Sequence, residues 1–182
     1  MALGISPNKS CNGGTAWWLS CNPEPLLIDC LPVTKCTLES LEELFEGRQA
    51  LIILTSREGH GRVRSIHEAL GWRVLVQEQE GYLLRSISSL ESFEESYVTI
   101  SGVKLLWTPG PIPGSWVAYA PNPWNVLFCG RLIIPLDLER LAAVRNRGTF
   151  HWNRQTKSLA RLLNWLPPEA STGLASGGNL AP

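Results

Sequence analysis

The chain has 182 residues, of which 44% are hydrophobic, and this length and composition suit one globular domain with a substantial core. Its 16 basic and 16 acidic residues cancel, so the net charge gives no reason to expect nucleic acid or an anionic membrane surface as a partner. No apolar run approaches the roughly 20 residues that a membrane-spanning helix needs, and the first residues do not resemble a secretory signal. We therefore expect a single cytoplasmic domain over residues 1–182 that does not insert into a membrane.

The five cysteines include no C-x-x-C pair, which argues against a zinc knuckle or a thioredoxin-like redox site. Their odd number also argues against a complete disulfide framework. Cys30 and Cys129 end apolar stretches, and we expect both to be buried as small hydrophobic side chains.

The first half of the chain alternates short apolar strands with amphipathic helices. This alternation is typical of βαβ units, in which helices cover a sheet. Proline and glycine residues separate the elements. The predicted elements are strands over 16–21 and 26–30, a helix that Thr37 caps and Gly47 ends, a strand over 50–54, a helix over 62–70 and a strand over 72–76.

The second half begins with a predicted meander of four strands and continues with two helices. The strands cover 97–100, 103–107, 116–119 and 126–129, and the helices lie around 138–145 and 159–166. Pro167-Pro168 closes the last helix, and the small, polar residues 171–182 predict a loosely ordered tail. Strands plus helices followed by strands plus helices suggest two half-units whose sheets pack face to face.

Five short segments, taken in order, carry a resemblance to a known family. They are Leu26–Asp29, Ile53–Thr55, Thr108–Gly110 with Pro113–Ser115 after it, Val126–Gly130 and Leu174–Gly178. In this order they resemble the metallo-β-lactamase fold superfamily, from about Ala16 to Gly178. The resemblance implies an α/β (α+β) fold, an αββα sandwich of two mixed β-sheets flanked by helices. Residues 149–155 further resemble a divergent cyanobacterial and plastid branch whose members lack much of the metal site.

The same resemblance identifies the positions where the superfamily carries metal ligands, beginning with an H-x-H-x-D-H loop. Here these positions hold Ser56, Glu58, His60, Gly61, Pro111, Arg131 and Gly177. Asp29 is retained, and in the family it supports the site without binding metal. Zinc needs about four imidazole or anionic donors, and proline, glycine and arginine supply none. The resemblance therefore implies a degenerate site with no catalytic residues, no metal and no cofactor.

Two alternative sites use the polar residues that remain. Glu58 and His60, joined by His67 or His151, could hold a single metal ion, although packing is the simpler role for the last two. Ser56 with His60 could act as nucleophile and base, but the loop lacks a G-x-S-x-G elbow and an evident orienting acid. We expect the Ser56 hydroxyl to bind loop backbone groups instead.

Two interpretations of the cationic residues stay open. In the first, backbone N–H groups of residues 59–61, ahead of the predicted helix, form an anion pocket with arginine side chains. The arginines are Arg57, Arg62, Arg64 and Arg131. In the second, Arg131 pairs with Glu58 or Asp29 and fills the space that a metal would occupy. We prefer the second, because an unpaired buried charge is costly.

The sequence thus predicts an inactive pseudoenzyme, a protein-interaction or assembly module in a photosynthetic organism, whose partner is another protein. Eight tryptophans support an interface, since one of Trp17 and Trp18 and the loop residue Trp124 are expected to be exposed. The alternative function is binding, or residual metal-independent hydrolysis, of a small anionic metabolite in the Arg-rich former active-site pocket. An electron-transfer role has less support, because the chain carries no iron–sulfur domain.

Overall fold

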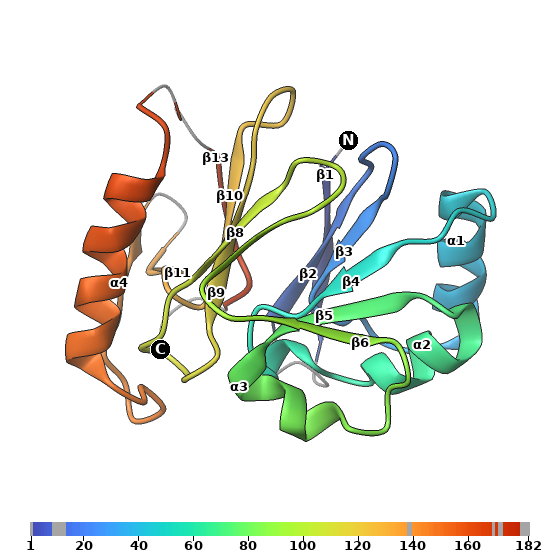
Figure 1. The fold of residues 1–182 in the computed structure, drawn as a ribbon, viewed down its shortest axis with the longest axis horizontal. Helices are drawn as coiled ribbons and strands as arrows, with labels where there is room; N and C mark the ends of the chain where they lie inside the picture. Colours follow the sequence, from blue (N-terminus) through green and yellow to red (C-terminus); the bar gives the residue numbers. More distant parts are fainter. Residues whose placement is uncertain (1, 9–13, 138–139, 169, 171–172, 179–182) are drawn as a thin grey trace.

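Two β-sheets face each other and helices cover their outer surfaces in the computed structural model, which describes residues 2–8, 14–137, 140–168, 170 and 173–178 (Figure 1). The first sheet has the strand order β1-β2-β3-β4-β5-β6, and the second has the order β13-β10-β9-β8-β7. The predicted αββα sandwich is confirmed. In the first sheet the strands are β1 (Ala2–Asn8), β2 (Gly14–Leu19), β3 (Leu26–Ile28), β4 (Leu51–Ile53), β5 (Arg73–Gln77) and β6 (Leu90–Phe93).

Both sheets are mixed. In the first, β1, β2 and β3 are antiparallel, and β3 to β6 are parallel. In the second, the predicted meander runs antiparallel, and the last strand pairs parallel with β10. The strands of the second sheet are β7 (Ser96–Val98), β8 (Lys104–Trp107), β9 (Trp116–Ala120), β10 (Val126–Gly130) and β13 (Gly173–Ser176).

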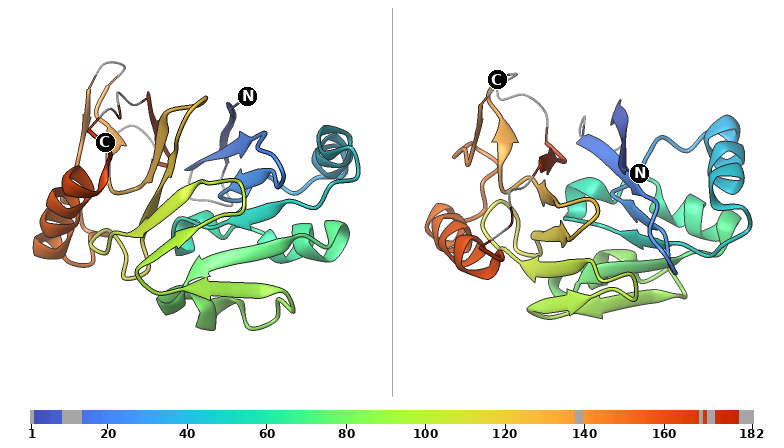
Figure 2. Two further views of the ribbon diagram at one scale, coloured as in Figure 1. Left: turned by 45° about the horizontal axis from the view of Figure 1, so that its top comes forward. Right: turned by 90° about the horizontal axis from the view of Figure 1, so that it is seen from above.

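The helices form two separate outer layers, as Figure 2 shows from two further directions. α1 (Lys35–Phe45) and α2 (Val63–Leu70) cover the first sheet, and α4 (Trp152–Trp165) covers the second. Shorter turns are η2 (Arg57–Gly59), α3 (Glu78–Gly81) and η3 (Tyr82–Leu84). Within the described ranges, no helix has the length and apolar character needed to cross a membrane.

Three apolar layers hold the sandwich together. Under α1, Phe45 packs between Trp18 and Trp72, with ring centroids 4.0 and 3.8 Å apart. Between the sheets, fully buried Trp116 is among the largest side chains. Under α4, Leu162 packs on the outer face of the second sheet. Apolar side chains alternate between the two faces of each strand, so each sheet contributes to two layers.

The structure corrects two of the predicted elements. The cap of α1 is Thr34, whose Oγ1 accepts a hydrogen bond from the Thr37 N–H at 3.1 Å. The helix predicted around 138–145 is wrong: β12 (Leu141–Ala142) pairs with β11 (Ile134–Pro135). The Arg140 N–H donates to Asp137 Oδ1 at 2.9 Å and favours the turn between these strands. Residues 138–139 of that prediction lie outside the described residues.

The tail predicted to be loose from residue 171 contains a strand. Residues 173–176 form β13, whose Ala175 is buried between the sheets. Residues 171–172 and 179–182 lie outside the described residues. Cys30 and Cys129 are fully buried, which confirms their predicted role as small core residues.

Candidate functional site

The ends of four strands meet at one rim of the sandwich. β3 and β4 are parallel, so their carboxyl ends lead to Asp29 and Thr55 at the same edge of the first sheet. The Trp116 N–H donates to the Thr55 carbonyl at 3.2 Å and ties the second sheet to this edge. Gly177, after β13, donates its N–H to the Gly130 carbonyl at the end of β10, at 2.8 Å. Residues from distant parts of the sequence therefore converge here.

Asp29 is the buried centre of this rim. The Thr55 N–H donates to Asp29 Oδ1 at 2.7 Å, and Thr55 Oγ1 lies 2.9 and 2.7 Å from the two carboxyl oxygens. Gly59 passes so close that a Cβ there would lie 2.1 Å from Asp29 Oδ1, which explains the need for glycine. A Cβ at Gly177 would lie 3.1 Å from Oδ2. Asp29 thus fixes the chain segments that border the site.

The environment of Asp29 disfavours its charge. Burial raises the pKa of this carboxyl to about 6, although the Thr55 hydrogen bonds and the Arg131 charge oppose the shift. Both carboxyl oxygens of Asp29 accept hydrogen bonds from Thr55.

Arg131 and Glu58 form the ion pair that the sequence led us to prefer. Arg131 Nε lies 2.8 Å from Glu58 Oε2, and the two side chains are 19% and 30% exposed. A guanidinium is cationic, so this position carries a positive charge where the superfamily has a metal ligand. Of the two carboxylates considered as its partner, Glu58 makes the contact.

A cavity of about 250 Å³ remains beside this ion pair. Pro111 and Gln155 line it from the second half of the chain. The Gln155 side chain is buried, and its Nε2 donates to the Leu132 carbonyl at 3.3 Å. Its Oε1 has no hydrogen-bond partner among the described residues. The other lining residues are Glu58, Ile112, Arg131, Ile134, Val144, Asn146, Gly148, Thr149 and Gly178.

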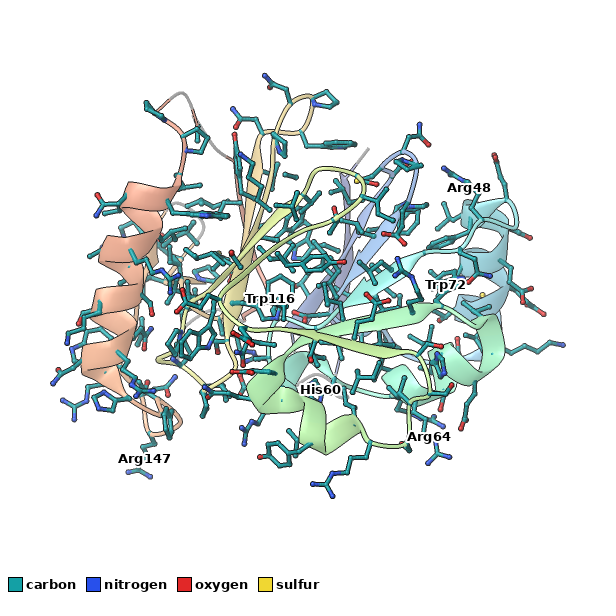
Figure 3. All side chains as sticks on the ribbon, in the orientation of Figure 1. Arg48, His60, Arg64, Trp72, Trp116 and Arg147 are labelled. Atoms are coloured by element: carbon teal, nitrogen blue, oxygen red, sulfur yellow. The ribbon has the colours of Figure 1, made fainter. Side chains whose placement is uncertain are left out.

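A second polar cluster lies on the side of the loop that faces α3, where Figure 3 labels His60. Buried Glu80 accepts a hydrogen bond from Arg57 Nη2 at 3.0 Å and one from the Gly114 N–H at 3.3 Å. His60 Nε2 lies 4.0 Å from Glu80 Oε2, too far for a hydrogen bond. Burial, aided by the Arg57 charge, lowers the pKa of His60 to about 4, so the imidazole is neutral near pH 7.

The structure separates the arginines that the sequence analysis had grouped in one anion pocket. Arg57 pairs with Glu80 and does not line the cavity, and Arg64 pairs with Glu68 on the surface at 2.7 Å. Two of the three loop N–H groups are also occupied: those of Gly59 and His60 donate to the Ser56 and Arg57 carbonyls. The four arginines of the predicted anion pocket are not brought together, and Arg131 alone of the four lines the cavity.

The two alternative sites also fail to assemble. His67 contacts the Trp72 carbonyl at 2.8 Å and Ser88 Oγ at 3.2 Å, and His151 caps α4. Ser56 Oγ is buried without a hydrogen-bond partner in the described part of the chain, so the expectation that it binds loop backbone groups is wrong. Gly61 adopts a left-handed conformation, with φ of 47°, between η2 and α2.

The tryptophans do not form the exposed surface that we expected. Trp18 is buried under α1, and Trp17 is half-buried against Phe128, with ring centroids 6.0 Å apart. None of the eight is among the exposed large hydrophobic residues. Half-buried positions are Trp17, Trp107, Trp124, Trp152 and Trp165.

The residues at this rim do not fit a metal. Glu58, the nearest carboxylate at a ligand position, already binds Arg131, and His60 faces the buried Glu80. Pro111 and Arg131 offer no donor to a cation. Across the described residues, no group of three or more His, Cys, Asp or Glu could hold a metal ion.

Sequence analysis missed Glu80. This residue lies 23 positions after Arg57, in a short helix that its own sequence pattern does not predict. The only local signal was an acidic residue three positions after the end of a buried strand.

Comparison with known proteins gives a consistent result for the fold. No protein-family model and no curated protein matches the sequence. The di-iron-bound form of TTHA1623 is 25% identical with a TM-score of 0.69, and the match covers 99% of this chain and 92% of that one. The B3 metallo-β-lactamase BLEG-1 is 20% identical with a TM-score of 0.72, over 100% and 92% of the two chains.

A third similar structure is ST1585 from Sulfolobus tokodaii, described as an archaeal metallo-β-lactamase superfamily protein. It is 15% identical with a TM-score of 0.68, and the match covers 97% of this chain and 80% of that one. The similarity therefore extends over the whole sandwich in each case. The chain has the metallo-β-lactamase fold.

Proposed function

We propose that this chain is a metal-free, non-hydrolytic member of the metallo-β-lactamase fold that acts by binding another protein in the cytoplasm of a photosynthetic cell. The observation that carries the proposal is the ion pair between Arg131 and Glu58, 2.8 Å long, at the rim where the strand ends converge. The similarity of residues 149–155 to a cyanobacterial and plastid branch supports the cellular setting.

The ion pair matters because it changes the charge of the rim. A bound cation attracts carboxylates and lowers the pKa of bound water, and this water then acts as the nucleophile. Here the positively charged guanidinium of Arg131 lies at that rim and repels a metal cation. Glu58 binds Arg131, Asp29 binds Thr55 and His60 faces Glu80, so within the described part of the chain no set of metal donors converges on one point.

Elemental analysis of the purified, tag-free protein tests the proposal directly. We expect less than about 0.1 zinc, iron or manganese per chain after incubation with each metal, and no hydrolysis of β-lactam, thioester or phosphodiester substrates. The positive control is a variant with restored donors, Ser56→His, Glu58→His, His60→Asp, Gly61→His, Pro111→His and Arg131→Asp. Stoichiometric metal in the wild-type protein would show that the proposal is wrong.

A second candidate function is supported by the cavity itself. Its volume of about 250 Å³ is close to the lower end of small-molecule sites, about 300 Å³. The buried acceptor Gln155 Oε1 lacks a partner among the described residues, so a ligand with a hydrogen-bond donor would satisfy it. An anionic group on the same ligand would lie near Arg131. Ser56 and His60 do not line the cavity, so binding without hydrolysis is the function that this site supports.

Thermal shifts with small hydroxylated carboxylates and phosphates test this candidate. A ligand of the cavity should stabilise the wild-type protein saturably, and Gln155→Leu and Arg131→Ala should each abolish the effect. Arg57→Ala is the matched control, because Arg57 is next to the cavity residue Glu58 in the sequence but does not itself line the cavity. Equal stabilisation of all four proteins would contradict binding at this site.

A further inference from the structure

The two halves of the sequence carry opposite charges of equal size. Residues 1–100 contain 8 basic and 13 acidic residues, a net charge of −5, and residues 101–182 contain 8 basic and 3 acidic residues, a net charge of +5. The halves form the two sides of the sandwich, so the neutral chain is strongly dipolar.

Part of the negative charge lies on α1 and its C-cap. The inner face of α1 packs on the first sheet through Leu41 and Phe45. Its outer face and its C-cap carry what we call the acidic stripe, which consists of Glu39, Glu42, Glu43 and Glu46, all exposed. The first three have the spacing i, i+3 and i+4 and therefore lie along one side of the helix, and Glu46 is the C-cap that follows the last turn. Among them, Glu39 has a helical ion pair, with Lys35 at 3.7 Å.

The positive charge is concentrated on α4, which contains no acidic residue. Arg154, Lys157 and Arg161 form the basic stripe, with the spacing i, i+3 and i+7, and all three are exposed. They border a groove of about 290 Å³ whose opposite wall is Trp107 and Pro109. Arg161 has an exposed ion pair with Glu95 at 3.1 Å, whereas no ion pair of Arg154 or Lys157 occurs among the described residues.

The two helices lie at opposite ends of the longest axis of the molecule (Figures 1 and 2). A molecule therefore presents the acidic stripe at one end and the basic stripe with its groove at the other. The stripes cannot meet within one chain, but they can meet between copies.

We propose that the groove beside α4 binds α1 of a second copy of this chain, so that the molecules associate head to tail. The basic stripe spans seven residue steps, about 10 Å of helix, and the acidic stripe spans the same number of steps from α1 into its C-cap, so the carboxylates and the cations match in number of steps as well as in sign. Such a contact joins two different surfaces and leaves one of each free on the outer molecules, which produces an open row. A net charge of zero means that the copies do not repel each other overall.

This inference deepens the proposed protein-binding function by naming the partner. Each exposed ion pair contributes little and is screened by salt, so the association is weak and depends on ionic strength. The half-buried indole of Trp107 and the ring of Pro109 add an apolar wall to the groove.

Sedimentation velocity at several protein concentrations tests the proposal. Between about 10 mM and about 1 M NaCl the Debye length falls from about 30 to about 3 Å, and we expect the association constant to fall at least about tenfold. Oligomers that persist in high salt, or a monomer at every concentration in low salt, would overturn the proposal.

Charge reversal identifies the two surfaces. The variant Arg154→Glu/Lys157→Glu has two acidic helices, and Glu42→Lys/Glu43→Lys has two basic ones, so each alone should be monomeric. An equimolar mixture should associate again, because each variant then meets its complement. Arg62→Glu/Arg85→Glu is the matched control: it reverses two exposed arginines outside both stripes and should associate like the wild type.

Circular dichroism confirms that each variant is folded. If the mixture of the two reversed variants stays monomeric, the partner is not a second copy, and the inference is wrong. Metal content is measured separately, so this failure leaves the metal-free proposal unaffected.

Discussion

Burial shifts the pKa values of Asp29 and His60 in opposite directions at the same rim. The carboxyl is raised to about 6 and the imidazole is lowered to about 4, because in both cases a dry environment disfavours the charged form. Asp29 therefore stabilises the folded protein at low pH, and His60 stabilises it at higher pH. Their effects oppose each other between about pH 4 and 6.5.

Replacing Asp29 removes one of the two opposing contributions to the pH dependence of the free energy of unfolding and leaves that of His60. The folded-state pKa of Asp29 lies above its unfolded value of 3.8, so its contribution is complete below pH 4 and is lost as pH rises through about 6. Relative to its value at pH 7, the contribution at pH 4 is up to about 3 kcal/mol. Asp29→Asn keeps an acceptor for the Thr55 N–H but does not titrate. Its free energy of unfolding, from urea titrations at pH 4 to 7, should fall more steeply on acidification than that of the wild type. Parallel curves would contradict the assignment.

Replacing His60 should have the opposite effect. Its folded-state pKa lies below the unfolded value of 6.5, so its contribution is complete above pH 6.5 and is lost as pH falls toward 4. In His60→Gln, the free energy of unfolding should decline less on acidification than in the wild type, by roughly 3 kcal/mol between pH 7 and 4. His67→Gln is the control, because His67 lies half-buried on α2. A similar change in both variants would show that His60 is not the cause.

At the scale of residues, the sequence predicted contacts between positions that the family resemblance had already placed together. The pair of Arg131 with Glu58 is of this kind. The contacts of Glu80 with Arg57 and of Gln155 with the cavity were not predicted, because no pattern in the sequence relates these positions. Ser56 was also mispredicted, since its hydroxyl points into a buried space that only the tertiary structure defines.

At the scale of elements, the loop after β8 determines where α4 lies. The carbonyl of Pro109 accepts from Ser158 Oγ at 2.7 Å, and that of Gly110 accepts from the His151 N–H at 2.9 Å. Gly110 has a φ of 151°, and a Cβ there would lie 2.3 Å from Gln155 Cα. The segment Thr108–Gly110, which carried part of the resemblance, thus has a structural role: its glycine lets the loop contact the helix backbone.

Gly110→Ala should therefore destabilise the protein through α4. The new methyl group meets helix backbone, which cannot move without shifting α4, so we expect a loss of about 2–4 kcal/mol in the free energy of unfolding. Gly81→Ala is the control, because a Cβ there has no neighbour within 4 Å. The comparison requires urea denaturation of both variants. A loss below about 0.5 kcal/mol in Gly110→Ala would contradict the close packing described here.

Elements with a strong local pattern were predicted well, and short strands were not. The helix that became α1 and the strands of the meander have clear periodicity. By contrast, β13 is held by its pairing with β10, about 46 residues away. β12 is held by its pairing with β11, although the apolar residues of this segment have a spacing that predicts a helix. For these strands the tertiary partner, and not local propensity, determines the conformation.

At the scale of the whole molecule, Trp116 joins the two halves. Its backbone N–H donates to the Thr55 carbonyl, and its Nε1 donates to the Leu54 carbonyl at 2.6 Å, 62 residues away (Figure 3). The indole is fully buried between the sheets. One side chain therefore supplies both a large part of the inter-sheet core and a hydrogen bond from the second sheet to the first.

Trp116→Phe should weaken the whole fold and not one half of it. The substitution leaves the buried Leu54 carbonyl without its side-chain donor and creates a small cavity, so we expect a loss of about 2–4 kcal/mol in the free energy of unfolding. Trp107→Phe is the matched control: its half-buried indole donates to the Pro113 carbonyl, six residues away, at 2.8 Å, and should cost less than about 1.5 kcal/mol. Far-UV circular dichroism and the fluorescence of the remaining tryptophans should report one common transition in Trp116→Phe, shifted to lower urea. Two separate transitions in the wild-type protein would show instead that the halves unfold independently and that Trp116 does not couple them.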